Sequence, residues 1–344
     1  MNERACIHIR EMSDVMEARQ TAMTISGAKG FGVVQSGNVA AIVTELATNL
    51  VKHAGEGDIL LRLYTDAEVS GIECLALDRG KGIKDIGRSL RDADPAGTGQ
   101  GDGLTSVRRL SSFFDFYSQP EKGTAVLARI DKESPAHKSG PQHPRHTSRI
   151  ENGVVCLPLQ PGEPCGDGWE IIRLPGRTVI LVVDGLGHGL EASKVQEEAI
   201  RIFRKNPTRE PVEILRILHA ALTGTRGGAV AVAVIDEKKG MVTFAGAGNI
   251  SGRIITGPDS RGMVSLNGTA GIEIRKFLED SHSWESESLL ILHSDGLTMQ
   301  WDLENYPGLK RKHPALIAGV LFRDHTRGGD DVTVLAVKKV EMNV

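Results

Sequence analysis

The sequence has few aromatic residues, no excess of positive charge and no long apolar run. Phe, Trp and Tyr make up 4% of its 344 residues, and its formal net charge of -3 provides no basic surface for nucleic acid. No apolar run approaches the roughly 20 residues that span a bilayer, and the opening MNERACIHIR contains no secretory apolar segment. We therefore expect a cytoplasmic protein that binds neither nucleic acid nor a membrane.

Cysteine is also scarce, whereas glycine is abundant. The four cysteines are far apart and form no CxxC pair, which argues against a zinc cluster or a disulfide framework and predicts reduced thiols. They are Cys6, Cys74, Cys156 and Cys165. The 40 glycines are more informative, because glycine concentrates where the backbone turns sharply or approaches a ligand closely.

The length fits two domains of ordinary size. The segment 131–152 has three prolines, three histidines and almost no apolar residue, so it cannot bury a core. The predicted parts are a domain at 1–132, a linker at 133–150 and a domain at 151–342. The linker histidines, His137, His143 and His146, have no fixed scaffold for a metal ion, and we interpret them as solvated.

Both predicted domains mix helices and strands. Residues 37–54 have apolar residues at helical spacing, and the short runs IECLALD and TAVLARI are typical of strands. In the second domain, several runs rich in β-branched residues are separated by glycine turns, and helical stretches interrupt them at about 191–205 and 211–223. This pattern predicts packed sheets in the middle and helices outside.

The first domain contains a helical polar face followed by glycine-rich loops. Glu45, Asn49 and His53 are spaced by four, which places them on one face of a helix. DRGKGI follows a strand-like run, and GTGQGDG at 97–103 precedes a helical stretch. Such a loop at a helix N-terminus can hold phosphate oxygens. Each signal alone is more often a solvated face or an ordinary loop.

Together, ELATN, DRGKGI, GTGQGDGL and KGT resemble the four boxes of the GHKL (Bergerat) ATP-binding fold, an α/β sandwich, over most of residues 35–130. They are most similar to those of anti-sigma-factor kinases of the RsbT and RsbW kind, which phosphorylate serine or threonine on a STAS-domain partner. The resemblance implies that Glu45 is the general base, that Asn49 holds the Mg²⁺ of Mg-ATP and that Asp78 binds the adenine amino group.

The resemblance also assigns the rest of the nucleotide pocket and its lid. The residues it implies are His53, Gly80, Gly82, Thr98, Gly99, Gly101, Gly103, Leu104 and Thr124. Asp102 departs from the family pattern, because it places a carboxylate in the loop that would face the phosphates. These roles suit phosphoryl transfer, which depends mainly on positioning and on charge neutralisation.

The second domain has four aspartates in glycine turns beside strand-like runs. Asp184 follows TVILVV, Asp295 follows SLLILHS, and Asp330 precedes VTVLAV; Asp167 lies in CGDGW. A single Asp-Gly pair is an ordinary turn signal. Four of them at strand ends can gather carboxylates at one edge of a sheet, and hard oxygen ligands without Cys or His select Mg²⁺ or Mn²⁺.

In order, CGDGW, VVDGLGHG, GAVAVAVID, FAGAGN, GTAG, HSDG and GGDDVTV resemble the PPM-type protein phosphatases of the SpoIIE and RsbX branch, over roughly residues 150–340. The resemblance implies an α-β-β-α layered sandwich that binds two ions. Asp184 would bridge them as the catalytic ligand, and the Gly185 carbonyl would complete one site. Asp295 and Asp330 would serve the other ion, with Asp167 in the same cluster.

Other polar residues near these motifs have no single role in the sequence pattern, and we expect them to be mainly structural. His188 could donate a proton to the leaving seryl oxygen, although we favour a structural role, because most histidines near such sites are not catalytic. Asn249 has the character of a turn residue, and Asp331 would face away from Asp330 in an extended chain. We identify no basic residue that binds the substrate phosphate; Arg173 is the nearest candidate, on a strand-like run.

The two resemblances imply a fusion of an anti-sigma-factor-type kinase domain with a metal-dependent serine/threonine phosphatase domain. The expected function is bacterial partner switching, in which the second domain dephosphorylates a STAS-domain protein and the first phosphorylates a STAS partner. The alternative is that the first domain binds ATP without catalysis and sequesters a sigma factor or a STAS protein. An anti-sigma factor is another expected partner, and kinases of this kind often form homodimers.

Overall fold

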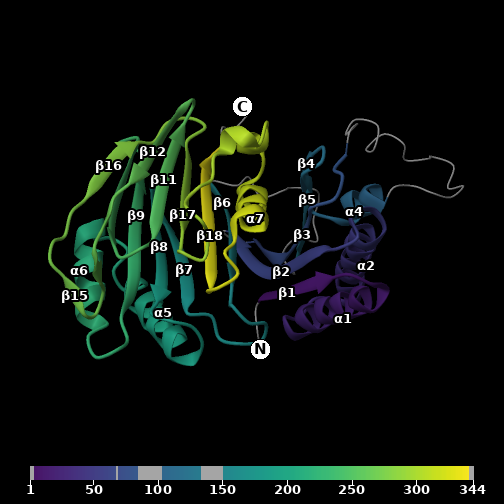
Figure 1. Cartoon of the computed structure of the whole chain (residues 1–344), viewed down its shortest axis with the longest axis horizontal. Helices are drawn as coiled ribbons and strands as arrows, with labels where there is room; N and C mark the ends of the chain where they lie inside the picture. The colour runs from purple at the N-terminus through teal and green to yellow at the C-terminus, as the bar shows by residue number, and fades with distance from the viewer. Residues whose placement is uncertain (1–3, 67–68, 84–102, 133–149, 341–344) are drawn as a thin grey trace, which may run out of the picture. The chain divides into compact units, whose positions relative to one another are not determined.

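The computed structural model describes residues 4–66, 69–83, 103–132 and 150–340 (Figure 1). The described residues form two compact units. One contains the chain up to residue 132 together with Leu303–Arg323, and the other contains 150–302 and 324–340. Of the predicted linker, only Ile150 lies within the described residues, where it begins a strand. No helix in these described stretches is long and apolar enough to cross a membrane.

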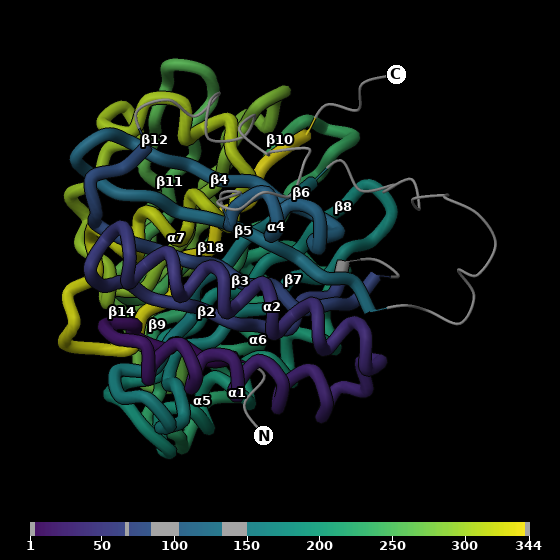
Figure 2. The backbone as a smooth tube through the Cα atoms, turned by 90° about the vertical axis from the view of Figure 1, so that its right-hand side faces the viewer, coloured from purple at the N-terminus to yellow at the C-terminus, as the bar shows by residue number. Residues whose placement is uncertain are grey.

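The first unit is built on a five-stranded antiparallel sheet with the order β1-β2-β3-β5-β4. Its strands are β1 (Arg4–Ile9), β2 (Gly57–Asp66), β3 (Val69–Asp78), β4 (Phe113–Gln119) and β5 (Gly123–Asp131). Figure 2 shows α1 (Met12–Ala28) and α2 (Val33–Asn49) side by side across this sheet. The expected helix at 37–54 is confirmed, but it starts at Val33 and its last turn, Leu50–Ala54, is a π-helix, η1.

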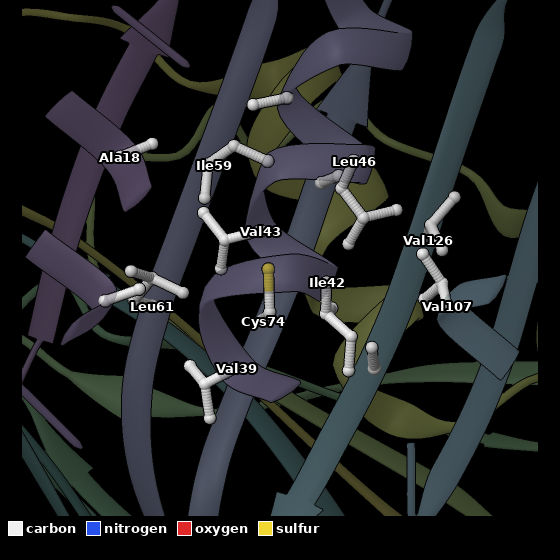
Figure 3. Close-up of a cluster of buried hydrophobic side chains, with 14 of the residues drawn as sticks. Ala18, Val39, Ile42, Val43, Leu46, Ile59, Leu61, Cys74, Val107 and Val126 are labelled. Atoms are coloured by element: carbon white, nitrogen blue, oxygen red, sulfur yellow. The ribbon is translucent and has the colours of Figure 1, made fainter. Parts of the chain in front are cut away.

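The core of this unit lies between α2 and the sheet (Figure 3). Val39, Val43 and Leu46, at helical spacing, are fully buried against alternate residues of the strands, such as Ile59 and Cys74. These alternate residues point to one face of the sheet because successive strand side chains point to opposite faces. Burial of this apolar stripe fixes which side of α2 faces away from the strands and so positions its polar side chains.

The opposite face of the sheet is also covered within this unit. Leu75 and Leu77 of β3 are buried there, and a β-carbon added at Gly319 of α7 (Pro314–His325) would lie 2.6 Å from Leu75 Cδ2. The Arg323 guanidinium donates a hydrogen bond to the Asp78 carbonyl oxygen at 2.8 Å. The segment that contains α7 therefore belongs to the same compact unit as the sheet, although it lies late in the sequence.

Glu73 forms a buried ion-pair network in the middle of β3. Its carboxylate lies 2.6 Å from Arg62 Nε and 2.7 Å from Arg129 Nη2. Burial would raise the pKa of Glu73, but the two guanidinium groups lower it from an ordinary 4.5 to about 2. Because the folded pKa is lowered, the stabilisation is complete above about pH 4.5 and is lost as the pH falls towards 2.

We expect Glu73→Gln to lower the free energy of unfolding by about 3 kcal/mol at pH 7, since it leaves two partly buried arginines without their carboxylate. The difference from wild type should shrink between pH 4.5 and 2, as wild-type Glu73 becomes protonated. Urea unfolding followed by circular dichroism at both ends of this range measures it. A difference that does not change with pH would contradict the role of the Glu73 charge.

The second unit contains two large sheets whose central strands are largely apolar. The first has the order β13-β10-β9-β8-β7 with β16 paired to β10, and the second has the order β12-β11-β17-β18-β6. The strands of the first sheet are β7 (Asp167–Leu174), β8 (Arg177–Gly185), β9 (Gly228–Asp236), β10 (Met241–Ala247), β13 (Ser265–Leu266) and β16 (Asp280–Ser283). Those of the second sheet are β6 (Ile150–Leu157), β11 (Ser251–Thr256), β12 (Asp259–Met263), β17 (Leu289–His293) and β18 (Val332–Lys339).

The first sheet is buried on both faces, which explains its uninterrupted apolar runs. Val179, Leu181 and Val183 of β8 pack with the helices α5 (Leu190–Phe203) and α6 (Pro211–Ala221), whereas Ile180 and Val182 pack towards the second sheet. A short hairpin, β14 (Gly268–Thr269) with β15 (Glu273–Ile274), adjoins β9. The predicted layered fold, with sheets packed together and helices outside, is confirmed for this part of the chain.

Candidate functional site

A cavity of about 380 Å³ opens beside the polar face of α2. Seven residues expected at a nucleotide site line it: Asn49, His53, Asp78, Gly82, Gly103, Leu104 and Thr124. Sequence reasoning missed its other lining residues: Leu46, Leu50, Ala54, Ala76, Lys81, Ile83 and Val126. The period-two spacing of Ala76 with Asp78, and of Thr124 with Val126, could have revealed some of them, because residues two apart on a strand share a face.

Asp78, the last residue of β3, is held by backbone amides at the wall of this cavity. Its Oδ1 accepts hydrogen bonds from the Gly80 N–H at 2.8 Å and from the Thr124 N–H at 3.1 Å. Burial raises the pKa of the Asp78 carboxyl, although both amides act in the opposite direction. Because both amides bond Oδ1, the other carboxylate oxygen of Asp78, Oδ2, is available to accept a hydrogen bond from a ligand.

Asn49 and Gly103, the first residue of α4 (Gly103–Leu110), line the cavity, and Glu45 lies beside Gly103. A β-carbon added at Gly103 would lie 2.5 Å from Glu45 Oε2 and 3.3 Å from Asn49 Nδ2. The expected base and the expected Mg²⁺ ligand therefore lie close together, beside a backbone position that has no room for a side chain. The other expected lid residues, Thr98, Gly99, Gly101 and Asp102, lie outside the described residues.

Gly103→Ala tests this close approach. We expect the added methyl group to displace the flexible ends of Glu45 and Asn49 and to lower the affinity for Mg-ATP about tenfold, the size of one lost hydrogen bond to a charged group. Titration with a fluorescent ATP analogue measures the change. The matched control is Gly37→Ala in α2, where an added β-carbon meets no atom within 4 Å. Equal affinities for the two variants would contradict the prediction.

A second candidate site lies where strands of both sheets of the second unit end. Asp167 begins β7 and pairs in register with Asp184 at the end of β8. Asp167 was expected in a turn, but it is the first residue of a strand and is 1% exposed. Its Oδ2 accepts a hydrogen bond from the Ser294 hydroxyl at 2.6 Å, just before Asp295. This bond connects the strand ends of the two sheets.

Asp331 and Gly296 complete that connection. Asp331 accepts hydrogen bonds from the Leu159 N–H at 2.6 Å and from the Gly166 N–H at 2.5 Å, so its carboxylate supports the backbone next to Asp167. A β-carbon added at Gly296 would lie only 2.0 Å from the Asp331 carbonyl oxygen, which requires glycine after Asp295. The acidic turns after β17 and before β18 thereby pack directly against each other.

Burial and neighbouring carboxylates raise the pKa values of Asp167, Asp184 and Asp330 at these strand ends. Burial, and then the charges of Asp295, Asp330 and Asp331, raise the pKa of Asp184 to about 7. Burial, and then Asp184, raise the pKa of Asp167 well above its ordinary range. Burial also raises the pKa of Asp330. We call Asp167, Asp184, Asp295 and Asp330 the acidic cluster. Its crowded negative charge would be relieved by bound cations.

The donor set of the acidic cluster fits a hard divalent cation. All the candidate side-chain ligands are carboxylates, and the buried Asp167 Oδ1 has no hydrogen-bond partner among the described residues. The Asn249 amide donates a hydrogen bond to Asp295 at 2.6 Å, a contact that the sequence did not predict. Among the described residues, no three His, Cys, Asp or Glu side chains are already arranged around one ion position. The carboxylates would therefore have to turn towards the ion.

His188 and Arg173 occupy different positions relative to this cluster. His188 Nδ1 lies 3.7 Å from Glu163 Oε2 at the surface, a contact that is ionic only when the ring is protonated. Arg173 lies near the other end of β7, six residues and about 20 Å from Asp167, where it donates a hydrogen bond to Asn152. Arg173 is therefore too far away to bind a phosphate at the acidic cluster.

Comparisons with known proteins match both parts of the chain. Residues 10–130 match the family model of the histidine kinase-like ATPase domain, and residues 175–340 match that of stage II sporulation protein E (SpoIIE). The serine/threonine-protein kinase RsbT of Bacillus subtilis (strain 168) is 33% identical over 128 residues, which cover 37% of this chain and 96% of RsbT.

Two solved structures are similar to parts of the chain. One, described as "The bacterial stressosome: a modular system that has been adapted to control secondary messenger signaling", has 28% identity and a TM-score of 0.51 over 55% of this chain and 100% of its own. RsbX in complex with magnesium has 19% identity and a TM-score of 0.47 over 55% of this chain and 94% of its own. The chain therefore belongs to the RsbT family through its N-terminal GHKL-type domain, which is fused to a SpoIIE-type PPM phosphatase domain.

Proposed function

We propose that this chain is a partner-switching regulator that hydrolyses phosphoserine or phosphothreonine on a STAS-domain protein. The observation that carries the proposal is the acidic cluster, in which carboxylates lie at the strand ends of two sheets that are joined by the bond from Ser294 to Asp167. Burial and neighbouring carboxylates raise the pKa values of Asp167 and Asp184 there. The likeness of the chain to SpoIIE and to a solved stressosome structure supports this function. Because the regulator would use ATP and a regulatory partner protein, we place its action in the cytoplasm.

The acidic cluster would hold two divalent cations, Mn²⁺ or Mg²⁺. These ions would neutralise the phosphate oxygens and lower the pKa of a water molecule for in-line attack. Asp184 would contact both ions, Asp295 and Asp330 would contact one of them, and the Gly185 carbonyl would complete the set. Asp331 and Ser294 orient the backbone and Asp167 through their hydrogen bonds, so they act as positioning residues. Hydrolysis by water requires no covalent phosphoenzyme.

The N-terminal domain would bind Mg-ATP and phosphorylate a STAS partner. Asp78 would accept a hydrogen bond from the adenine amino group with the oxygen that the Gly80 and Thr124 amides leave available. Asn49 would hold the Mg²⁺, and Glu45 would accept the proton of the partner's hydroxyl group. The closeness of Glu45 and Asn49 at Gly103 favours transfer of phosphate over simple retention of ATP, because the base lies next to the metal ligand.

A phosphate-release assay tests the phosphatase proposal. A STAS-domain protein phosphorylated on serine is incubated with the full chain, with Mn²⁺ or Mg²⁺ and then with excess chelator. We expect release with the cation, loss of release with the chelator and recovery when cation is restored. An absence of release with either cation would contradict the proposal.

The kinase role has a separate readout, which is the transfer of labelled phosphate from ATP to the partner protein. We expect this transfer to be lost in Glu45→Ala. Tight binding of the partner without transfer would mean that the N-terminal domain is a sequestering module.

A further inference from the structure

We propose that Arg226, in the turn between α6 and β9, binds the substrate phosphate beside the acidic cluster. The proposal rests on the phosphatase function proposed above and supplies the basic residue that the sequence did not reveal. A phosphoserine side chain carries close to two negative charges at neutral pH. A cluster of carboxylates repels such a group, so a cationic side chain at its edge would aid binding.

The register of the first sheet places Arg226 next to the loop that follows Asp184. Asp184 pairs with Ala229, and Gly185 pairs with Gly228. One residue further, the Leu186 N–H donates a hydrogen bond to the Gly227 carbonyl oxygen at 3.0 Å. Arg226 is therefore the next residue along this edge, opposite Gly187. The Arg226 side chain therefore begins about three residue positions beyond Asp184, just past the end of β8, the strand that carries Asp184.

The guanidinium group extends over that loop. A β-carbon added at Gly187 would lie 3.4 Å from Arg226 Nη1. The turn that holds Arg226 is fixed, because the Thr225 hydroxyl accepts a hydrogen bond from the Gly227 N–H at 3.0 Å and donates one to the Leu222 carbonyl at 2.7 Å. A defined backbone position reduces the conformational freedom that Arg226 would lose on binding a ligand.

Arg226 is exposed and has spare donors. Within the described part of the chain, its side chain forms no hydrogen bond or ion pair. Its charge acts on Glu191, at the start of α5, without a direct contact. An arginine that is held in place and keeps its donors available can bind two phosphate oxygens at once, because the planar guanidinium matches their geometry.

Exposed apolar side chains lie on both sides of Arg226. Leu186 is 46% exposed and precedes Gly187, and Ile272 is 61% exposed. A β-carbon added at Gly227 would lie 3.0 Å from Ile272 Cγ1, so Ile272 adjoins the same turn. These side chains can contact the residues next to the phosphoserine of a protein substrate. The surface therefore fits a phosphorylated loop of a protein better than a free phosphate ion.

Arg327, which adjoins the loop after Asp295, serves as the comparison. Its N–H donates a hydrogen bond to the Gly296 carbonyl oxygen at 2.9 Å, and its charge acts on the buried His293. Its backbone is thus tied to the loop after Asp295, whereas Arg226 is tied to the loop after Asp184. Because Asp184 is the residue proposed to contact both ions, the phosphate should lie on the Arg226 side.

The test compares Arg226→Ala, Arg226→Lys and Arg327→Ala in the full chain with a phosphorylated STAS-domain protein and Mn²⁺. We expect Arg226→Ala to lower kcat/KM about 10- to 100-fold, mainly through KM, because a charge-assisted contact to the phosphate is lost. Arg226→Lys should be intermediate, since lysine keeps the charge without the planar fork. The Mn²⁺ concentration for half-maximal activity should not change. Arg261→Ala, at an exposed position of β12, is the matched control and should equal wild type.

Each outcome decides the proposal. Wild-type kcat/KM in Arg226→Ala, with an active wild-type enzyme, would overturn the role of Arg226 and leave the phosphatase function intact. A larger effect of Arg327→Ala would instead place the phosphate on the other side of the cluster. A changed Mn²⁺ requirement in Arg226→Ala would mean that this residue acts on the metal site. An inactive wild-type enzyme would refute the proposed phosphatase function, and the Arg226 proposal with it.

Discussion

Asp184→Asn should lower phosphate release from a phosphorylated STAS-domain protein about 100-fold or more. The change removes the carboxylate proposed to contact both ions, and a loss of about 3 kcal/mol of transition-state stabilisation corresponds to this factor. Release of inorganic phosphate at saturating Mn²⁺ measures it. Asp259→Asn, at an exposed position of β12, makes the same chemical change away from the cluster and should be as active as wild type.

A stability measurement separates a functional Asp184 from a structural one. In the presence of chelator, neighbouring carboxylates and burial disfavour the charged form of Asp184, whose pKa is raised to about 7. Removing that charge should leave the melting temperature equal to or above that of wild type at pH 8. A variant that loses both activity and stability would mean that Asp184 supports the fold, and an active variant would refute its proposed role.

Asp78→Asn should lower the affinity for ATP about 100-fold. The variant keeps an oxygen that can accept the Gly80 and Thr124 amides, so the local fold should persist. It presents an NH₂ group where the wild type offers an acceptor to the adenine amino group, and two donors cannot pair. Loss of a hydrogen bond to a charged group costs about 1.5–3 kcal/mol, and an unpaired donor adds to it. Calorimetric titration with Mg-ATP measures the affinity.

The choice of nucleotide provides a second readout for Asp78. GTP carries a carbonyl oxygen where ATP carries the amino group, so Asp78→Asn should bind GTP relatively better than wild type does. Asp58→Asn on β2, whose carboxylate bonds the exposed His8 at 2.7 Å, is the matched control and should bind ATP normally. Unchanged ATP affinity in Asp78→Asn would show that another group holds the adenine.

Local sequence patterns predicted where several of the candidate residues lie in the fold. The spacing of four placed Glu45 and Asn49 on one face of α2, because the α-helical period is independent of the rest of the fold, whereas His53 lies in the π-helical turn that follows. The strand-end positions of Asp184, Asp295 and Asp330 were predicted by the apolar runs that flank them. In both cases local periodicity contains the information, so tertiary structure is not required for the prediction.

Contacts between distant parts of the chain could not be predicted in this way. Arg226 lies beside the loop that follows Asp184 only because β9 pairs with β8, and the bond from Asn249 to Asp295 depends on two loops of different strands. The glycine-rich sequence CGDGW predicted a turn at Asp167, but the backbone of Asp167 pairs with that of Asp184 in a strand instead. Strand register determines these contacts, and glycine content does not encode register.

The segment 303–323 was the largest surprise of the fold. It lies within residues 175–340, which match SpoIIE, yet it joins the compact unit that contains the nucleotide cavity. Lys312 Nζ lies 2.9 Å from Asp115 of β4, and Gly319 packs on Leu75 and Leu77 of β3. One signal was present in the sequence. The two alternating sets of residues in IECLALD, which point to opposite faces of the sheet, are both largely apolar, and this predicts a sheet covered on both sides.

The most direct test measures both activities on one STAS-domain protein. The protein is incubated with Mg-ATP, Mn²⁺ and wild-type chain, Asp184→Asn or Glu45→Ala, and intact-mass spectrometry gives its phosphorylated fraction over time. If the kinase site adds phosphate and the phosphatase site removes it, the phosphorylated form should accumulate with Asp184→Asn, and the protein should stay unphosphorylated with Glu45→Ala. The same phosphorylated fraction with all three chains would contradict the proposed opposing roles of Glu45 and Asp184 on this protein.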